Sequence, residues 1–309
     1  MTSVAIDMKQ VRKTYGKKVV AVENLSLQVK TGSIFALLGP NGSGKTTTIR
    51  MLTSLVSKDG GDIHIFGENK IDKHVIGCVA QNSGVDPLGT GKENLMMQGK
   101  IYGLKGQILK KRVDELLKMF HLEKDQNRLS KNYSGGMKRK LDLAMGIIHK
   151  PRLLFLDEPT TGLDPEARSD LWKMIKQLQE EQGMTVVLTT HYMEEADELA
   201  DYVAFMNEGK LVIEGTKESL KRGMKSDTLI FQSPHVEKAK EVLQGENQLV
   251  VKEDKLHVQV TDGATKLPEL LHELKEHGVD IDSVTLSKVN LGDVYFMHTG
   301  KTLMKGESK

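Results

Sequence analysis

The stretch "SIFALLGPNGSGKTTTIRML" (residues 33–52) decides the fold of this chain. A short apolar run leads into "GPNGSGKTT" (residues 39–47), which fits the pattern G-x-x-x-x-G-K-[ST], and a helix is expected from about Thr46 to Leu55. Strand, glycine loop and helix in this order are the context in which backbone N–H groups surround phosphates and a lysine reaches them. We therefore expect an α/β domain that binds a nucleotide.

Outward from this loop the chain alternates strands and helices. Residues 4–29 contain two alternating apolar stretches around a turn-rich segment, which predicts an antiparallel β layer. Between about residues 90 and 130, apolar residues recur at intervals of three and four, which predicts helices. The apolar runs in "PRLLFLDEP" (151–159) and "MTVVLTTH" (184–191) flank a further helical pattern, as in a parallel sheet covered on both faces.

The character of the chain changes after "LVIEGTKESLKRG" (211–223). Residues 227–298 alternate short strands and helices and contain no catalytic motif. Their order is strand, helix, strand, strand, helix, strand, which favours a ferredoxin-like α+β fold. We expect a nucleotide-binding domain over residues 1–222 and a smaller accessory or regulatory domain over residues 223–309.

Composition limits the classes of partner. The 44 lysines and arginines nearly balance 42 acids, for a net charge of +2, which argues against nucleic acid as the main ligand. The longest apolar runs are strand-sized, far below the ~20 residues that a helix needs to span a bilayer. The N-terminal stretch mixes charges and has no apolar core, so we expect no signal peptide. A cytosolic protein is expected, with any membrane passage in another chain.

A second stretch, "NYSGGM" (132–137), has the form of a helix N-terminus prepared for an anion. Ser134 can cap the helix, while Gly135 and Gly136 let backbone N–H groups approach a ligand closely. The sequence therefore contains two segments suited to binding phosphate, far apart along the chain.

Polar residues at the ends of the buried strands supply the candidate chemistry. Lys45 is expected to reach the β and γ phosphates of a nucleotide, and Thr46 to offer its hydroxyl to Mg²⁺. Asp157 ends one buried strand, where it can hold the magnesium, and Glu158 follows it, where it can polarise an attacking water. His191 ends the next strand and should reach the same sheet edge, where ligands collect in open α/β folds.

Five separated motifs occur in an order that resembles the nucleotide-binding subunit of ABC transporters. They are "GPNGSGKTT" as Walker A, Gln81 in "GCVAQNSG" as the Q-loop, "YSGGM" as the signature, "LLFLDE" as Walker B, and "TTGLD" with His191 as D-loop and switch histidine. The resemblance implies an α/β P-loop cassette with a mixed sheet core, an antiparallel β layer and a helical subdomain. It also implies an ATPase that uses ATP and Mg²⁺.

In this family two subunits face each other head to tail, and the signature of one closes over the ATP of the other. The resemblance implies such a dimer, with a second copy or a related ATPase subunit. It implies Glu158, His191 and Gln81 as catalytic residues, and Thr46, Gln81 and Asp157 as magnesium ligands. The implied ATP contacts, with Tyr15 as the residue that stacks on adenine, are Tyr15, Gly39, Asn41, Gly42, Ser43, Gly44, Lys45, Thr46, Thr47, Ser134, Gly135, Gly136 and Asp164.

Finer motifs resemble the daunorubicin-resistance type of ATPase within this family, namely "YSGGMKRKLDLA", "LDEPTTGLDP", "TGKENL" and "HYMEEADELAD". This resemblance implies a peripheral subunit at the cytoplasmic face of the membrane. It would power export of a drug, a lipid or another hydrophobic compound through a separate ABC-2 permease, which docks near Gln81 to Asn94. The signature departs from the family's commonest form at Tyr133 and Met137, and Met137 cannot make the polar contacts of an amide.

Two other interpretations stay open. A soluble ABC-type ATPase without a permease, acting on ribosomes or DNA, would usually carry paired cassettes or long coiled-coil insertions, and neither is visible in the sequence. A nucleotide-binding module without turnover would need a damaged base or magnesium ligand, whereas Lys45, Asp157 and Glu158 are all present.

Overall fold

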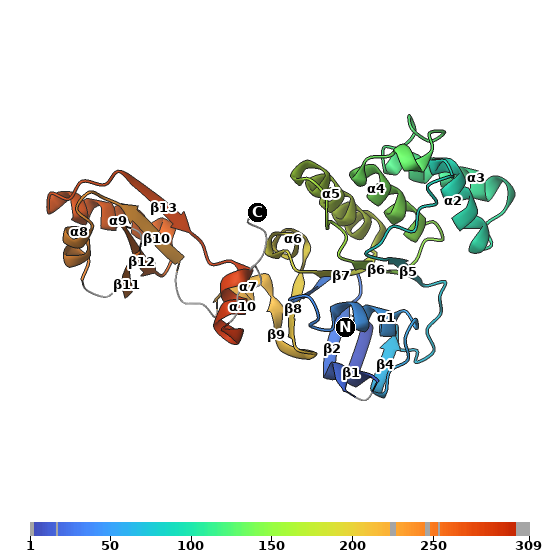
Figure 1. Ribbon diagram of the computed structural model, residues 1–309, viewed down its shortest axis with the longest axis horizontal. Helices are drawn as coiled ribbons and strands as arrows, with labels where there is room; N and C mark the ends of the chain where they lie inside the picture. The colour runs from blue at the N-terminus through green and yellow to red at the C-terminus, as the bar shows by residue number, and fades with distance from the viewer. Residues whose placement is uncertain (1–2, 17, 223–226, 245–247, 253, 301–309) are drawn as a thin grey trace. The chain divides into compact units, whose positions relative to one another are not determined.

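The computed structural model of the protein describes residues 3–16, 18–222, 227–244, 248–252 and 254–300. The chain divides into two compact units, one up to Lys217 and one from Glu218 onward. Figure 1 shows both units, coloured from blue at the N-terminus to red at the C-terminus.

A six-stranded mixed sheet forms the centre of the first unit (Figure 1). Its strands lie in the order β5 (Ile76–Val79), β6 (Leu153–Asp157), β7 (Thr185–Thr190), β3 (Ile34–Leu38), β8 (Tyr202–Asn207) and β9 (Lys210–Thr216). Neighbouring strands pair in parallel, except that β9 runs antiparallel to β8. Every residue of β3, β6 and β7 is buried, as expected for strands covered on both faces. The parallel sheet predicted from these apolar runs is confirmed.

The predicted antiparallel β layer is also present. It consists of β2 (Val19–Lys30), β1 (Val4–Tyr15) and β4 (Gly60–Ile65), in that order. Strand β4 was not predicted from the sequence. One hydrophobic cluster joins this layer to the main sheet and to helix α1 (Lys45–Leu52); it includes Val22 and Leu25 of β2, Phe35 and Leu37 of β3, and Ile49 and Leu52 of α1. The packing fixes the glycine loop between two β layers.

Helices cover the other side of the main sheet, as Figure 1 shows for α4 and α5. Helices α4 (Gly135–Gly146) and α6 (Met193–Leu199) contact strands of this sheet, and α5 (Pro165–Gln182) packs against both of them. Helix α2 (Gly91–Ile101) packs on α4 and on α3 (Gly106–Met119), and the short 3₁₀ helix η1 (Ser130–Asn132) precedes α4. Helix α2 begins with a capping box, in which the Thr90 side chain accepts from the Glu93 N–H and the Glu93 side chain accepts from the Thr90 N–H. The helical region predicted between residues 90 and 130 is thus confirmed.

Helix α1 is shorter than the sequence pattern suggested. It ends at Leu52, and Thr53 is its C-terminal cap, so the expected end at Leu55 is wrong. The physical reason lies at Ser54, whose φ of 58° is left-handed and stops the helix. Leu55 is then 71% exposed and does not contribute to the apolar face.

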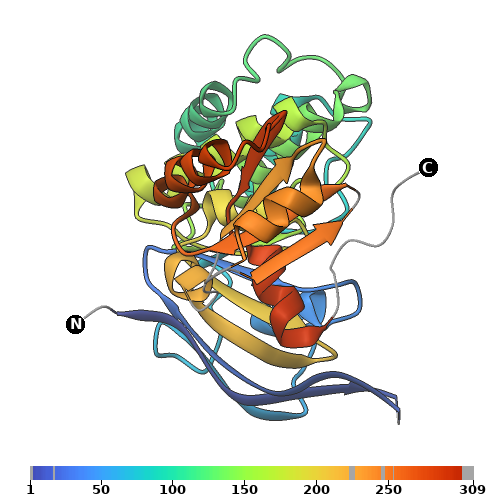
Figure 2. The same ribbon diagram turned by 90° about the vertical axis from the view of Figure 1, so that its left-hand side faces the viewer.

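The second unit contains a four-stranded antiparallel sheet in the order β11 (Gln248–Lys252), β12 (Lys255–Val260), β10 (Asp227–Gln232) and β13 (Ser283–Ser287). Its helices α8 (Val236–Val242) and α9 (Gly263–Glu276) complete the βαββαβ order expected within residues 227–298. Leu229, Phe231, Leu256 and Val258 of the sheet form one hydrophobic core with Ala239 of α8 and Leu274 of α9. Figure 2 turns the molecule so that this unit faces the viewer.

Two further helices, α7 (Lys217–Arg222) and α10 (Leu291–Thr299), were not identified from the sequence. Helix α10 begins with a capping box between Asn290 and Asp293. The box uses Asn and Asp in place of the usual Ser or Thr with Glu, which weakens its signal in a sequence.

Candidate active site

The glycine loop connects the end of β3 to the start of α1 through backbone conformations that other residues rarely adopt. Gly44 has a φ of 102°, and a Cβ atom there would lie 2.3 Å from the carbonyl oxygen of Ala21. A Cβ at Gly39 would lie 2.2 Å from the carbonyl oxygen of Met206. The loop is therefore pressed against two strands, and glycine is required at both positions.

Lys45 is the first residue of α1, and its side chain is 4% exposed. Its ammonium donates hydrogen bonds to the loop carbonyls of Gly39, at 2.7 Å, and Pro40, at 3.0 Å. Burial lowers the pKa of Lys45, and this effect is opposed by the carboxylates of Glu158 and Asp157. The ammonium group of Lys45 therefore lies between the loop carbonyls and the carboxylate of Glu158.

Asp157 is the last residue of β6 and is buried. Its Oδ1 accepts hydrogen bonds from the hydroxyl of Thr46, at 3.1 Å, and from that of Thr189, at 2.5 Å. A carboxylate and a hydroxyl are hard oxygen donors, and Mg²⁺ commonly binds proteins through one or two carboxylates together with substrate phosphates. Thr46 and Asp157 are therefore suited to bind a magnesium ion that is also bound by the phosphates of a nucleotide.

Glu158 lies at the centre of the cluster and is 7% exposed. Its Oε2 accepts from Gln81 Nε2 at 3.1 Å and from the Thr161 hydroxyl at 3.2 Å. Its Oε1 lies 3.3 Å from Nδ1 of His191 and 3.9 Å from Nζ of Lys45. The neighbouring His191 and then the charge of Lys45 hold the pKa of Glu158 below its usual value, against the effect of burial. The group is therefore an ionised carboxylate surrounded by donors.

The backbone of Glu158 is left-handed, with a φ of 48°. Its N–H donates to the carbonyl oxygen and to the hydroxyl of Thr189, both at 3.1 Å. Such a conformation is unfavourable for a residue with a side chain and persists only where the surroundings fix it. Here it turns the carboxylate toward Lys45 and His191.

The sequence-predicted residues Lys45, Thr46, Gln81, Asp157, Glu158 and His191 are brought together by the ends of β3, β5, β6 and β7. The signature residues have a different role within one chain. Ser134 caps α4 by accepting from the Met137 N–H at 3.2 Å, and Asp164 caps α5 by accepting from the Ala167 N–H at 2.9 Å. Neither contact reaches the glycine loop. Tyr15, at the end of β1, is 38% exposed, and Nζ of Lys13 lies 5.7 Å from its ring centroid.

Packing explains the tyrosine at position 133 of the signature. Tyr133 is 4% exposed, and its hydroxyl donates to the Asp125 carbonyl oxygen at 2.8 Å. A Cβ at Gly91 would lie 2.3 Å from this hydroxyl oxygen, so the tyrosine packs directly against the start of α2. Tyr133 thus ties the signature to the helices beside it. Met137 contributes its backbone N–H to the cap of α4.

Three buried polar residues near the site were not predicted from the sequence. Arg139 of α4 donates to the backbone carbonyl oxygens of Pro159 and Glu158. Thr189 holds Asp157 and Glu158. Glu195 of α6 is fully buried and accepts from the Thr160 hydroxyl at 2.8 Å and from Trp172 Nε1 at 3.1 Å, and burial raises its pKa. The one available signal was a polar residue within an apolar run, as at Thr189.

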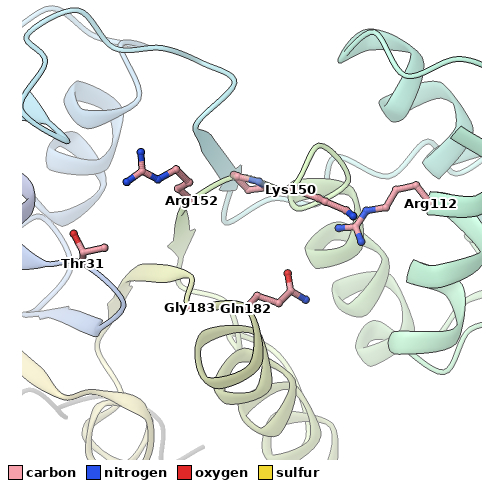
Figure 3. A pocket seen from close by; sticks show the side chains of 7 residues that line it. Thr31, Arg112, Lys150, Arg152, Gln182 and Gly183 are labelled. Atoms are coloured by element: carbon pink, nitrogen blue, oxygen red, sulfur yellow. The ribbon is translucent and has the colours of Figure 1, made fainter. Parts of the chain in front are cut away.

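A pocket at the opposite edge of the sheet has another explanation (Figure 3). It is lined by Thr31, Arg112, Lys150, Pro151, Arg152, Gln182 and Gly183, several of which precede β3, β6 and β7. Arg112 donates to the carbonyl oxygens of Ile147 and Ile148 at the end of α4. Cations beside the last carbonyls of a helix are favoured by its dipole. This pocket therefore takes no part in the Lys45–Glu158 cluster.

Within the parts of the chain that the structure describes, no helix has the length and apolar character needed to span a membrane.

The loop, the buried acids and the two β layers define a class of protein, the P-loop nucleotide-binding cassettes. Comparisons identify the family. The family model for the ABC transporter domain matches residues 22–161. The daunorubicin resistance ATP-binding protein DrrA2 of Streptomyces coeruleorubidus is 36% identical over 321 aligned positions, which cover 100% of this chain and 99% of that protein. The chain belongs to the ABC transporter family and is an ATPase of that family.

Two further relatives agree with this assignment. The linearmycin resistance ATP-binding protein LnrL of Bacillus subtilis (strain 168) is 36% identical, over 96% of this chain and 99% of that protein. Among solved structures, the dimeric post-hydrolysis state of the ATP-binding cassette MJ0796 with ADP and Pi superposes with a TM-score of 0.62. It is 29% identical and covers 68% of this chain and 98% of the other. The α/β cassette fold expected for the first domain is confirmed.

Proposed function

We propose that this chain is the ATP-hydrolysing subunit of an exporter, and that it powers the passage of a drug-like, lipid or other hydrophobic compound through a separate ABC-2 permease. The observation that carries the proposal is similarity over the full length to ATP-binding proteins named for resistance to daunorubicin and linearmycin. The intact cluster around Glu158 supports turnover rather than simple binding.

In the proposed mechanism, Lys45 and the loop amides bind the phosphates, and the ring of Tyr15 stacks on the adenine. Thr46, Asp157 and Gln81 would hold Mg²⁺, which would neutralise charge on the phosphates. Glu158 is ionised and accepts a proton from the attacking water as general base. His191, 3.3 Å from Glu158, orients this carboxylate and lies on the γ-phosphate side.

The signature is assigned to a second subunit. Ser134 caps α4, so the N–H groups of Gly135 and Gly136 lie at the positive end of a helix of 12 residues. A Cβ atom at Gly136 would lie 3.0 Å from the side chain of Ala167 in α5, and one at Gly135 would lie 3.6 Å from that of Leu163. Both glycines therefore lie beside the start of α5 and not beside the glycine loop of their own chain, and they suit the γ-phosphate of a partner's ATP. The dimeric state of the MJ0796 cassette supports this arrangement. ATP would then join the two subunits, and hydrolysis would release them.

We assign the segment from Gln81 to Asn94 and the helices after it as the surface on which the permease docks. Leu88 in this segment is 74% exposed, and Met97, Ile101 and Ile108 are 61%, 67% and 72% exposed. Met97 and Ile101 lie four residues apart on α2, and therefore on one face of it. Exposed apolar side chains in this region suit an apolar partner, and they support a working position of the chain at the cytoplasmic face of the membrane.

The test is export in cells. A strain that lacks this gene is compared with strains that carry the wild-type gene or the Glu158→Gln variant at equal protein levels. We expect the wild type alone to lower the intracellular level of a fluorescent anthracycline or polyene. If a panel of hydrophobic compounds accumulates equally in all three strains while the purified chain hydrolyses ATP, the export assignment is wrong and the ATPase assignment stands.

A further inference from the structure

Helix α4 carries a buried pair of opposite charges, Arg139 and Asp142, one turn after the signature. The two residues are 8% and 7% exposed. Their closest charged atoms, Nη1 of Arg139 and Oδ2 of Asp142, are 4.0 Å apart, well beyond the 2.7–2.9 Å of a direct charged hydrogen bond. Both side chains direct their hydrogen bonds elsewhere.

Arg139 donates to backbone carbonyls of two segments. Its Nη1 donates to Ala80 at 2.7 Å, and Ala80 immediately precedes Gln81. Its Nε donates to Pro159 at 2.6 Å, and its Nη2 lies 3.2 Å and 3.3 Å from the carbonyl oxygens of Asp157 and Glu158. The planar guanidinium thus spans the gap between the segment that contains Gln81 and the end of β6.

Asp142 holds the other end of the same segment. Its Oδ1 accepts from the N–H of Gly84 at 2.9 Å, and the side chain of Ser83 also hydrogen-bonds to it. We call residues 80–84 the Gln81 segment. Arg139 binds its first residue, and Asp142 binds its last two. All five residues of the segment are exposed, whereas Arg139 and Asp142 are buried.

The position of Gln81 matters because its Nε2 contacts Oε2 of Glu158 at 3.1 Å. An exposed segment with free ends would not keep an amide at this distance. Arg139 donates hydrogen bonds both to the backbone carbonyl before Gln81 and to that of Glu158. It therefore fixes the two partners of this contact relative to each other. A buried pair of charges is weak evidence for stability alone, since well-packed apolar residues often serve equally well.

We propose that Arg139 and Asp142 are positioning residues, which hold the Gln81 segment at both ends and set the contact of Gln81 with Glu158. This inference rests on the proposed function for its effect on ATP turnover. Because Ser134 is the N-cap of α4, the pair also connects the signature of each chain to the Gln81 segment of the same chain.

The test compares two substitutions of Asp142 with a control on the same helix. Asp142→Ala removes the acceptor for Gly84, whereas Asp142→Asn keeps a carbonyl oxygen there. Lys140→Ala is the control, because Lys140 lies between the pair on α4 but contacts Asp170 at 3.4 Å instead. Amide hydrogen exchange of the Gln81 segment, ATP affinity and kcat are measured for each full-length variant.

We expect Asp142→Ala to speed exchange at residues 81–84 about fivefold or more, because the segment loses its hold on α4. ATP affinity should stay within about twofold, while kcat falls about tenfold to a hundredfold, as misplaced groups near a reaction centre do. Asp142→Asn and Lys140→Ala should resemble the wild type in all three measurements. Unchanged exchange and kcat in Asp142→Ala would overturn the proposal, as would an Asp142→Asn variant that folds and loses as much as Asp142→Ala.

A second substitution covers the case in which Asp142→Ala does not fold. Arg139→Lys keeps the charge, but a single ammonium cannot reach the carbonyls of Ala80 and Pro159 together. We expect faster exchange at residues 80–82 and a lower kcat, with ATP affinity retained. A folded Arg139→Lys chain with wild-type exchange would overturn the proposal. The exchange measurement needs no turnover, so a wild-type chain without ATPase activity would refute the proposed function and leave this test intact.

Discussion

Nδ1 of His191 lies 3.3 Å from Oε1 of Glu158, although the two residues follow different strands. Glu158 comes directly after β6 and His191 directly after β7, and these strands pair in parallel. Parallel neighbours end at the same edge of the sheet, so two residues 33 positions apart in sequence become partners. The contact keeps the carboxylate ionised and gives the site its proposed base.

Replacement of the proposed base should separate binding from turnover. We expect Glu158→Gln to bind ATP with near wild-type affinity and to release phosphate about 10²- to 10⁴-fold more slowly, because an amide can orient water but cannot accept its proton. Phosphate release and gel filtration with ATP measure both effects, and the variant should run as a dimer. Glu123→Gln, an exposed glutamate of the same unit, is the control. Unchanged phosphate release would remove Glu158 from the base role.

Loss of the loop lysine should act on binding itself. Lys45→Ala deletes the cation that lies between the loop carbonyls and Glu158, and we expect ATP affinity to fall about tenfold or more. Titration with a fluorescent ATP analogue measures the change, with the exposed Lys110→Ala as control. If Lys45→Ala binds ATP as the wild type does, the loop has been assigned wrongly.

The lowered pKa of Glu158 predicts how stability depends on pH. A group whose pKa is lower in the folded state contributes stability above its unfolded pKa, and this contribution is lost as the pH falls through the folded value. We expect Glu158→Gln to lower the free energy of unfolding near pH 7, and the difference from wild type to shrink as the pH falls below 4.5, the ordinary pKa of a glutamate. Urea unfolding across this range gives the curve. A difference that is constant with pH would contradict an ionised, stabilised Glu158.

The signature assignment predicts complementation between chains. Ser134→Arg disables the helix N-terminus and Lys45→Ala disables the loop, so a mixed dimer contains one intact composite site, whereas either pure variant contains none. We expect mixing to restore part of the ATPase activity. If demonstrated heterodimers stay inactive, crosslinking to a γ-phosphate analogue decides, because Ser134 is present only on the Lys45→Ala chain. Label on this Ser134 would support the assignment, and an analogue that is bound without label there would refute it.

The second unit is predicted to be dispensable for nucleotide binding. A chain that ends at Arg222 retains every residue assigned to ATP, so we expect it to bind ATP within about twofold of the full chain but to form dimers or couple to the permease less well. ATP affinity and membrane-stimulated ATPase activity test the two halves of this prediction. A folded truncation that cannot bind ATP would refute the first half, and one that transports as well as the full chain would refute the second.

Much of the catalytic cluster could be predicted because its residues sit at the ends of apolar runs. Asp157, Glu158 and His191 follow buried strands, and the sequence alone indicates that these ends meet. Arg139 and Asp142 could not be found in this way. They lie in "KRKLD" on a helix, where charged residues usually face water, and their partners are backbone atoms 18 to 59 residues away. Such contacts have no periodicity in the sequence. Ser54 was missed for a similar reason, because nothing in its side chain requires a left-handed backbone.

The exposed Leu88, Met97, Ile101 and Ile108 would also affect the chain before it meets the proposed permease. Large apolar side chains in water favour self-association and attract chaperones and proteases. A subunit made in excess of its permease would therefore be recognisable by these four side chains and be removed or aggregate first. The surface proposed for docking would in this way also match the amount of this subunit to the amount of permease in the cell.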